Sequence, residues 1–168
     1  MNKLKRWALE SQGSPLKRWI LNSVLWRKIP FNRPHKLTLD QCTEKEVGIR
    51  IPFIKKNKNH LNGLHACVML TAAEYASGMM LMLKSNQEFR IIMKDISASY
   101  HYQGKMEARA QFGLTDQEFE NQVVRPLKEN DKIDFQANVL IHDVKQNKLC
   151  DVRVVWQLKK WNKVKTSL

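Results

Sequence analysis

The chain has 168 residues, a net charge of +13 and three cysteines. This length fits one domain with its own core, and the 43% share of hydrophobic residues excludes an intrinsically disordered chain. An odd number of cysteines without a Cys-x-x-Cys pair suggests neither a disulfide framework nor a zinc knuckle, and it favours a reducing cytoplasm. The positive charge indicates an anionic partner (nucleic acid, a membrane or a phosphate-bearing molecule) or serves only general solvation.

Residues 1–28 form a basic lead that contains three tryptophans. It lacks the apolar stretch and the cleavage site of a secretory signal. Ser14 followed by Pro15 predicts the start of a helix, with serine as the N-cap and proline in the first turn. We expect its apolar stripe to pack on the domain, and the alternative is an interfacial helix on an anionic membrane. The stripe consists of Leu16, Trp19, Ile20, Ser23 and Val24.

Alternating apolar and polar residues predict strands on both sides of one long apolar segment. Two strands are expected at 37–39 and 46–53, joined by a turn at 43–45. A polar loop at 55–60 then leads to a helix over about 64–83. Four more strands are expected at 89–102, 106–112, 133–141 and 150–158.

The connections between the later strands also carry local signals. A change of phase near Ile92 is typical of a β-bulge, and Gln103-Gly104 predicts a tight hairpin turn. Thr115 and Glu118 form a capping box that should start a short helix ending near Pro126.

The segment 64–83 holds one acidic residue, Glu74, and no lysine or arginine. It is long enough to span a bilayer, but a carboxylate at the bilayer centre would cost about 3 kcal/mol. We therefore expect a core helix, apolar on nearly all sides and covered by a curved antiparallel sheet of about six strands. This is an α+β hotdog fold over residues 29–162, followed by a basic tail at 163–168. A second copy would complete the burial of the helix, so a homodimer is expected.

Glu74 is the residue on which the chemistry depends. A lone buried carboxylate is costly unless it is paired, so Glu74 is either a structural group bonded to a neighbouring hydroxyl or a functional one. The loop 59–65 ends where the helix begins, and helix N-termini carry free N–H groups. A thioester carbonyl placed there would be polarised, and its oxyanion stabilised.

The segment 59–78 (NHLNGLHACVMLTAAEYASG) resembles the active-site segment of hotdog thioesterases of the phenylacetyl-CoA type. Asn59, Gly63, His65 and Glu74 stand where that family has an asparagine, a glycine, a histidine and a carboxylate. The resemblance covers about residues 30–160 and also points to an uncharacterised bacterial branch of hotdog proteins.

The resemblance implies an acyl-CoA thioesterase in which coenzyme A is part of the substrate and no metal or other cofactor is needed. Glu74 would be the general base or the nucleophile, and the Ala66 N–H would hold the carbonyl oxygen. Asn59 would orient the water or the thioester, and His65 would fix the loop. Gly63, Leu64 and Cys67 complete the expected substrate loop.

Two residues depart from the family pattern. Ala66-Cys67 replaces a glycine pair, and Glu74 replaces the common aspartate. These departures keep a second hypothesis open, a protein that binds acyl groups or acyl-CoA without hydrolysing them. Cys67 itself is expected to be a small buried hydrophobe rather than a nucleophile.

The remaining expectations concern partners. The site would be shared across the dimer interface, and pairing of two dimers into a tetramer is open. No nucleic-acid-binding module is visible. His101 and the pair His142-Asp143 lack the spacing of a metal site. The protein is expected in the cytoplasm, with peripheral contact of residues 1–28 with an anionic membrane as the alternative.

Overall fold

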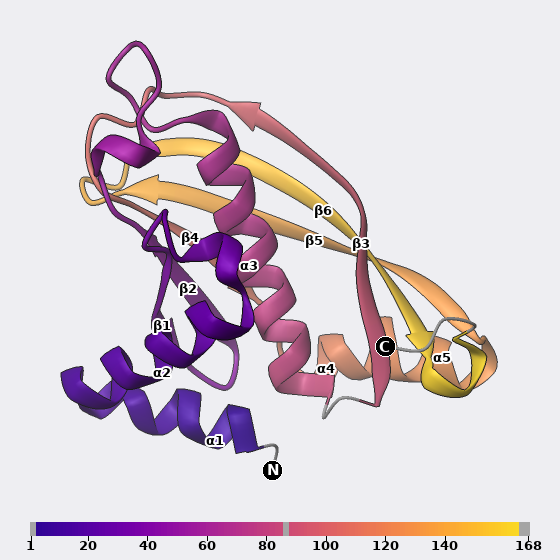
Figure 1. Ribbon diagram of the computed structural model, residues 1–168. Coiled ribbons are helices and arrows are strands. Elements are labelled where there is room, and N and C mark those ends of the chain that lie inside the picture. Colours follow the sequence, from indigo (N-terminus) through magenta and orange to yellow (C-terminus); the bar gives the residue numbers. More distant parts are fainter. Residues whose placement is uncertain (1–2, 86–87, 165–168) are drawn as a thin grey trace.

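In the computed structural model, which describes residues 3–85 and 88–164, six antiparallel strands curve around one long helix, α3 (Ala66–Ser85) (Figure 1). The expected α+β hotdog fold is thereby confirmed. The strand order across the sheet is β1-β2-β4-β5-β6-β3. The strands are β1 (Thr38–Cys42), β2 (Glu46–Ile51), β3 (Phe89–Tyr100), β4 (Ala108–Gly113), β5 (Lys132–Asp143) and β6 (Lys148–Lys160).

The core lies between α3 and the concave face of the sheet. Along β5 burial alternates, so that Ala137, Val139 and Ile141 point into the core and their neighbours point to solvent. Small fully buried residues on α3, Ala72 and Ala76, let the helix lie close to these strands. Although α3 is long and apolar enough to cross a membrane by length and composition, most of it is buried against the sheet, as in a core helix.

The predicted hairpin at Gln103-Gly104 is wrong. β3 pairs with β6 at the edge of the sheet, whereas β4 lies between β2 and β5. The chain crosses between them over 101–107, and Met106 lies outside the strand. Gly104 allows a close approach, since an added Cβ would lie 3.0 Å from a methyl carbon of Leu149, and its carbonyl accepts a 2.7 Å hydrogen bond from the N–H of Leu64.

Other local signals hold in part. The β-bulge expected near Ile92 lies between Met93 and Asp95. The capping box is present, but the helix does not end near Pro126, which instead occupies the first turn of α5, where its missing N–H costs nothing. This region comprises α4 (Asp116–Phe119), the π-helical turn η4 (Glu120–Val124) and α5 (Arg125–Glu129).

The N-terminal lead forms α1 (Lys3–Glu10) and α2 (Pro15–Lys28), which pack beside β1 and α3 (Figure 1). Ser14 caps α2 as expected by accepting from the N–H of Lys17 at 3.4 Å. Short 3-10 helices make up the remaining helical elements: η1 (Ser11–Gly13), η2 (Pro30–Asn32), η3 (Lys55–Asn57) and η5 (Trp161–Lys163).

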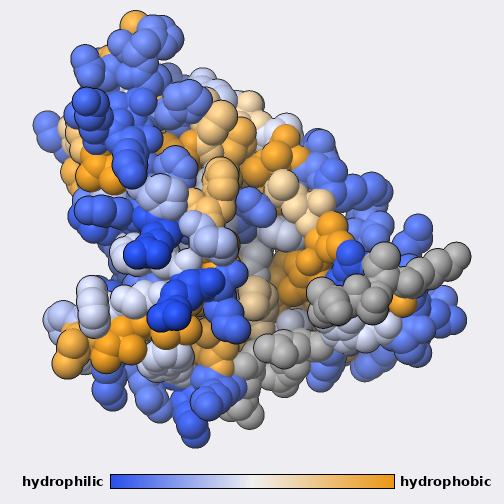
Figure 2. Space-filling view, in the orientation of Figure 1, coloured by the Kyte–Doolittle hydropathy of each residue, from blue (hydrophilic) through white to orange (hydrophobic). Residues whose placement is uncertain are grey.

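The expected packing of the α2 stripe is wrong. Leu16 and Trp19 are 66% and 65% exposed, and Leu21 and Leu25 are buried in their place. Figure 2 shows a hydrophobic patch over the start of α2. The helix is turned this way because buried Asn22 hydrogen-bonds the backbone of β1, which fixes the inward face.

Candidate functional site

Glu74 lies in the middle of α3 and is half-buried. Within the described part of the chain its carboxylate has no hydrogen-bond or ion-pair partner. The nearest hydroxyls along the helix are used elsewhere, because Thr71 donates to the carbonyl of Cys67 and Ser77 to the carbonyl of Ala73, both at 2.9 Å. The structural explanation, a carboxylate bonded to a neighbouring hydroxyl, therefore finds no support.

Burial raises the pKa of the Glu74 carboxyl above its usual value, and no nearby cation offsets this. A carboxyl with a raised pKa accepts a proton more readily near neutral pH. Such a perturbed, unpaired group on the wall of a cavity has the properties of a functional residue.

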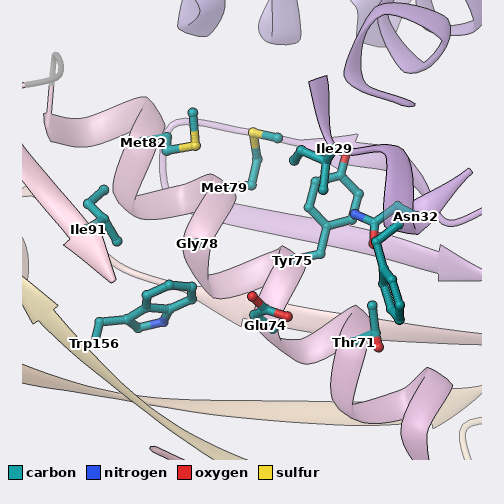
Figure 3. Close-up of a pocket in the computed structure, with 11 residues that line it drawn as sticks. Ile29, Asn32, Thr71, Glu74, Tyr75, Gly78, Met79, Met82, Ile91 and Trp156 are labelled. Carbon is teal, nitrogen blue, oxygen red and sulfur yellow. The ribbon is translucent and has the colours of Figure 1, made fainter. Parts of the chain in front are cut away.

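The cavity beside Glu74 measures about 310 Å³, which lies within the range of small-molecule sites. Its walls come from α3, from η2 and the residue before it, and from β3 and β6. Figure 3 shows the Glu74 carboxylate with Trp156 on one side and Thr71 on the other. The main apolar lining residues are Ile29, Phe31, Met79, Met82, Ile91 and Trp156.

One wall of this cavity is rigid. The indole N–H of Trp156 donates to the buried hydroxyl of Ser77 at 3.0 Å. A Cβ on Gly78 would lie only 3.0 Å from the indole, so glycine is what lets the ring lie against the helix. The cavity therefore has an apolar shape that is set before any ligand binds.

Asn59 shapes the loop that precedes α3. Its side-chain oxygen accepts from the N–H groups of Leu61 and Gly63, both at 3.0 Å, and its own N–H donates to the carbonyl of Gly63 at 2.8 Å. Leu64 is only 2% exposed and lies beneath the loop. The Asn59 oxygen expected to orient water or the thioester is thus engaged within the loop.

The first turn of α3 has one free donor. The Cys67 N–H donates to Nδ1 of His65 at 3.1 Å, and the N–H of His65 donates to the carbonyl of Asn57 at 2.8 Å. The Ala66 N–H makes no hydrogen bond with the described residues, and Ala66 is exposed. An N–H left free in this way is able to donate to a ligand's carbonyl oxygen, and the role expected of Ala66 stays a prediction.

Cys67 is exposed, not buried as expected. A second hollow of about 320 Å³ lies beside Ala66. Tyr100 contributes to it and donates from its hydroxyl to the Ala66 carbonyl at 3.4 Å. Sequence reasoning missed Tyr100, because nothing in the sequence shows that the end of its strand lies beside the start of α3.

Ala66 and Glu74 are eight residues apart on one helix, which corresponds to about 12 Å along the helix axis. A reacting carbonyl needs its oxygen donor and its attacking group each within about 3 Å. One chain therefore does not bring the two groups to the same carbonyl. In residues 3–85 and 88–164 no group of three or more histidines, cysteines and carboxylates is placed to hold a metal.

The curved sheet around a single helix, with a carboxylate facing a cavity from that helix, defines a protein of the hotdog class. The chain belongs to the family described as a domain of unknown function, DUF4442, whose model matches residues 17–164. No curated protein matches it.

Solved structures with this fold are similar over most of the chain. A Pseudomonas aeruginosa protein of unknown function, described as a probable thioesterase, is 18% identical with a TM-score of 0.74, and the match covers 83% of this chain and 93% of that one. A protein of unknown function from Chlorobaculum tepidum is 14% identical with a TM-score of 0.73, over 89% and 99%. A Haemophilus influenzae thioesterase is 11% identical with a TM-score of 0.64, over 81% and 87%.

Proposed function

We propose that this protein hydrolyses acyl-CoA thioesters as a homodimer, with its active site at the subunit interface. The observation that supports this proposal most strongly is the unpaired Glu74 carboxylate, which lines an apolar cavity and has a raised pKa. The separation of about 12 Å along α3 supports a shared site, because a partner helix running the opposite way can bring its own carboxylate to the free Ala66 N–H. The thioesterase descriptions of two structural neighbours support the reaction class.

In this mechanism the thioester carbonyl oxygen accepts from the Ala66 N–H, which stabilises the charge that develops on the oxygen. Glu74 of the partner subunit either removes a proton from a water molecule that attacks the carbonyl carbon, or attacks that carbon itself. The carbon–sulfur bond then breaks, and the thiolate of coenzyme A takes up a proton, from the Glu74 carboxyl in the water route or from solvent in the other, and leaves as the thiol. Where Glu74 itself attacked, the acyl group is left on the carboxylate as a mixed anhydride, which water hydrolyses to release the acid and restore Glu74. The cavity of about 310 Å³ would hold the acyl group.

Two variants test the two halves of the site separately. Glu74→Gln keeps the shape of the side chain but removes the base. Ala66→Pro removes only the N–H, since proline is tolerated at the first position of a helix. We expect each to lower thiol release from an acyl-CoA panel by at least about 100-fold. Ala66→Gly retains the N–H and is the matched control, and wild-type rates in both test variants would contradict the mechanism.

The second candidate is a protein that binds acyl-CoA without turnover. One observation favours it: His65 engages the Cys67 N–H, so a single donor remains at the start of α3. Saturable acyl-CoA binding without thiol release, weakened when the apolar cavity is altered at Gly78, would select this candidate.

The exposed face of α2 supports a further element of the proposal, peripheral contact with an anionic membrane. Leu16, Trp19 and Ile20 are all exposed there. Basic residues Lys17, Arg27 and Lys28 accompany them on the same helix. An apolar face bordered by cations is the pattern of an interfacial helix.

A further inference from the structure

A basic hollow of about 520 Å³ lies on the surface between two segments that are distant in sequence. The residues after η2 form one side and the residues around η3 form the other. We call it the basic hollow; it is lined by Arg33, Pro34, Lys36, Ile54, Lys55 and Lys56. Four of its six lining residues are cations and none is an acid.

These cations have no counter-charge of their own. In the part of the chain that the structure describes, the side chains of Arg33, Lys36, Lys55 and Lys56 take part in no ion pair or hydrogen bond. Many other cations are paired, for example Arg109 with Asp40 at 2.6 Å and Arg153 with Asp95 at 2.8 Å. The sequence explains the difference, because residues 11–39 and 47–73 contain no aspartate or glutamate at all.

Four like charges around one hollow raise the local positive potential, and this favours a bound anion. The hollow also has an apolar side, formed by Pro34 and Ile54. Cations that contact phosphate and an apolar surface that contacts a base are together what a phosphorylated nucleotide requires.

The hollow is connected to the candidate active site through Asn57. The Asn57 side chain donates to the carbonyl of His35 at 2.9 Å. The ring nitrogen Nδ1 of His35 is hydrogen-bonded to the side-chain oxygen of Asn57 at 3.0 Å. The carbonyl of Asn57 accepts from the N–H of His65 at 2.8 Å, directly before the free Ala66 N–H. The segment that carries Arg33 and Lys36 is thereby held against the loop that begins α3.

We propose that the basic hollow binds the phosphates of coenzyme A and that Pro34 and Ile54 contact its adenine. This inference rests on the proposed thioesterase function and assigns the nucleotide to the subunit that supplies Ala66. The uncharged pantetheine arm then runs from the hollow to the start of α3, where the thioester meets the Ala66 N–H. Figure 2 shows hydrophilic surface on the side of the molecule that carries residues 33–36 and 54–58.

The test compares an acyl-CoA with the matching acyl-pantetheine, which has the same thioester but no phosphate or adenine. The probe is thiol release by the full-length protein at low and at moderate salt. We expect KM for the wild type to be at least about tenfold lower for the acyl-CoA, and the advantage to shrink as salt screens the charges. Lys55→Gln with Lys56→Gln should remove most of that advantage.

The matched control removes two cations from the far end of the molecule. Lys128→Gln with Lys132→Gln changes the net charge equally, on α5 and the start of β5, and should keep the acyl-CoA advantage (Figure 1). If the wild type shows equal KM values for the two substrates, or if the Lys55/Lys56 variant behaves like the control, the inference is overturned while the hydrolase proposal stands.

A direct measurement separates the two proposals. If neither thioester releases thiol, the hydrolase proposal is wrong. Titration calorimetry with coenzyme A alone then tests whether the basic hollow binds the nucleotide. Affinity that falls about tenfold in the Lys55/Lys56 variant but not in the control supports the hollow. Equal affinity in all three proteins overturns it.

Discussion

The side-chain amide of Asn22 makes both backbone hydrogen bonds of Leu39, donating to its carbonyl at 3.0 Å and accepting from its N–H at 2.8 Å. Asn22 is buried, and β1 is an edge strand whose outer side would otherwise lack partners. The amide therefore makes the two hydrogen bonds that a neighbouring strand would make to Leu39, and it attaches α2 to the sheet.

Asn22→Ala should destabilise the protein by about 2–4 kcal/mol, because two buried backbone groups lose their partners. Denaturant unfolding measures this. Ser23→Ala is the control, since Ser23 only donates to the carbonyl of Trp19 in its own helix, and it should change stability by less than about 0.5 kcal/mol. Equal effects of the two changes would show that the pair does not anchor α2.

Gly78→Ala should be costly although it adds a single methyl group. The new Cβ would meet the Trp156 indole at 3.0 Å, and the ring is held by Ser77. We expect a loss of about 1–3 kcal/mol and weaker binding of bulky acyl groups. Gly13→Ala is the control, because nothing lies within 4 Å of a Cβ there. A neutral Gly78→Ala variant would mean that Trp156 moves freely.

Glu74 and Glu118 should have opposite effects on stability as pH changes. Burial raises the folded-state pKa of Glu74, so the wild type loses stability as pH rises through that value. Glu74→Gln mimics the protonated form and should melt at a higher temperature than the wild type at pH 7. The difference should vanish below about pH 4, under the usual value for glutamate.

Glu118 supplies the contrast. Hydrogen bonds from the backbone and side chain of Thr115 lower its pKa, so its stabilising effect is present at neutral pH and is lost as pH falls through the lowered value. Glu118→Gln should therefore melt below the wild type at pH 7 and approach it in acid. Thermal melts of both variants from pH 3 to pH 8 test the two signs together.

Removing the exposed apolar face of α2 should weaken membrane contact. Leu16→Ala with Trp19→Ala should lower partitioning onto anionic vesicles by at least about tenfold, because both side chains lose apolar area that would be buried. Leu140→Ala with Val144→Ala removes exposed apolar residues from β5 and from the position directly after it, away from α2, and is the control. If both variants bind the vesicles equally in a sedimentation assay, α2 is not the element that contacts the membrane.

The helix and its carboxylate were predictable because their signals are local. A segment of twenty mostly apolar residues, in which Glu74 is the one acidic residue, requires a covered helix, and the strands around it alternate clearly. The segment before the helix likewise predicted a free N–H at Ala66. The structure confirms the covered helix and the sheet around it, whereas the catalytic roles of Glu74 and Ala66 stay predictions.

Strand partners and helix orientation depend on distant residues, so local patterns misjudged them. Nothing near Gln103 shows that β3 will pair with β6, because β6 comes much later in the chain, after β4 and β5. The outward face of α2 is just as apolar as its inward face, and a hydrogen bond 17 residues away decides between them. The walls of the cavity beside Glu74 could not be predicted for the same reason, because they bring together residues from distant parts of the chain, such as Phe31 and Trp156.

The distance along α3 between Ala66 and Glu74 has a genetic consequence. In the proposed dimer each site takes its donor from one subunit and its base from the other, so the two inactivating changes complement each other when they lie on different chains. If Ala66→Pro and Glu74→Gln subunits are mixed in equal amounts, about half of the dimers contain one subunit of each kind. Each of these mixed dimers has one intact site and one site that carries both substitutions. Two inactive proteins would then regain about a quarter of the wild-type rate.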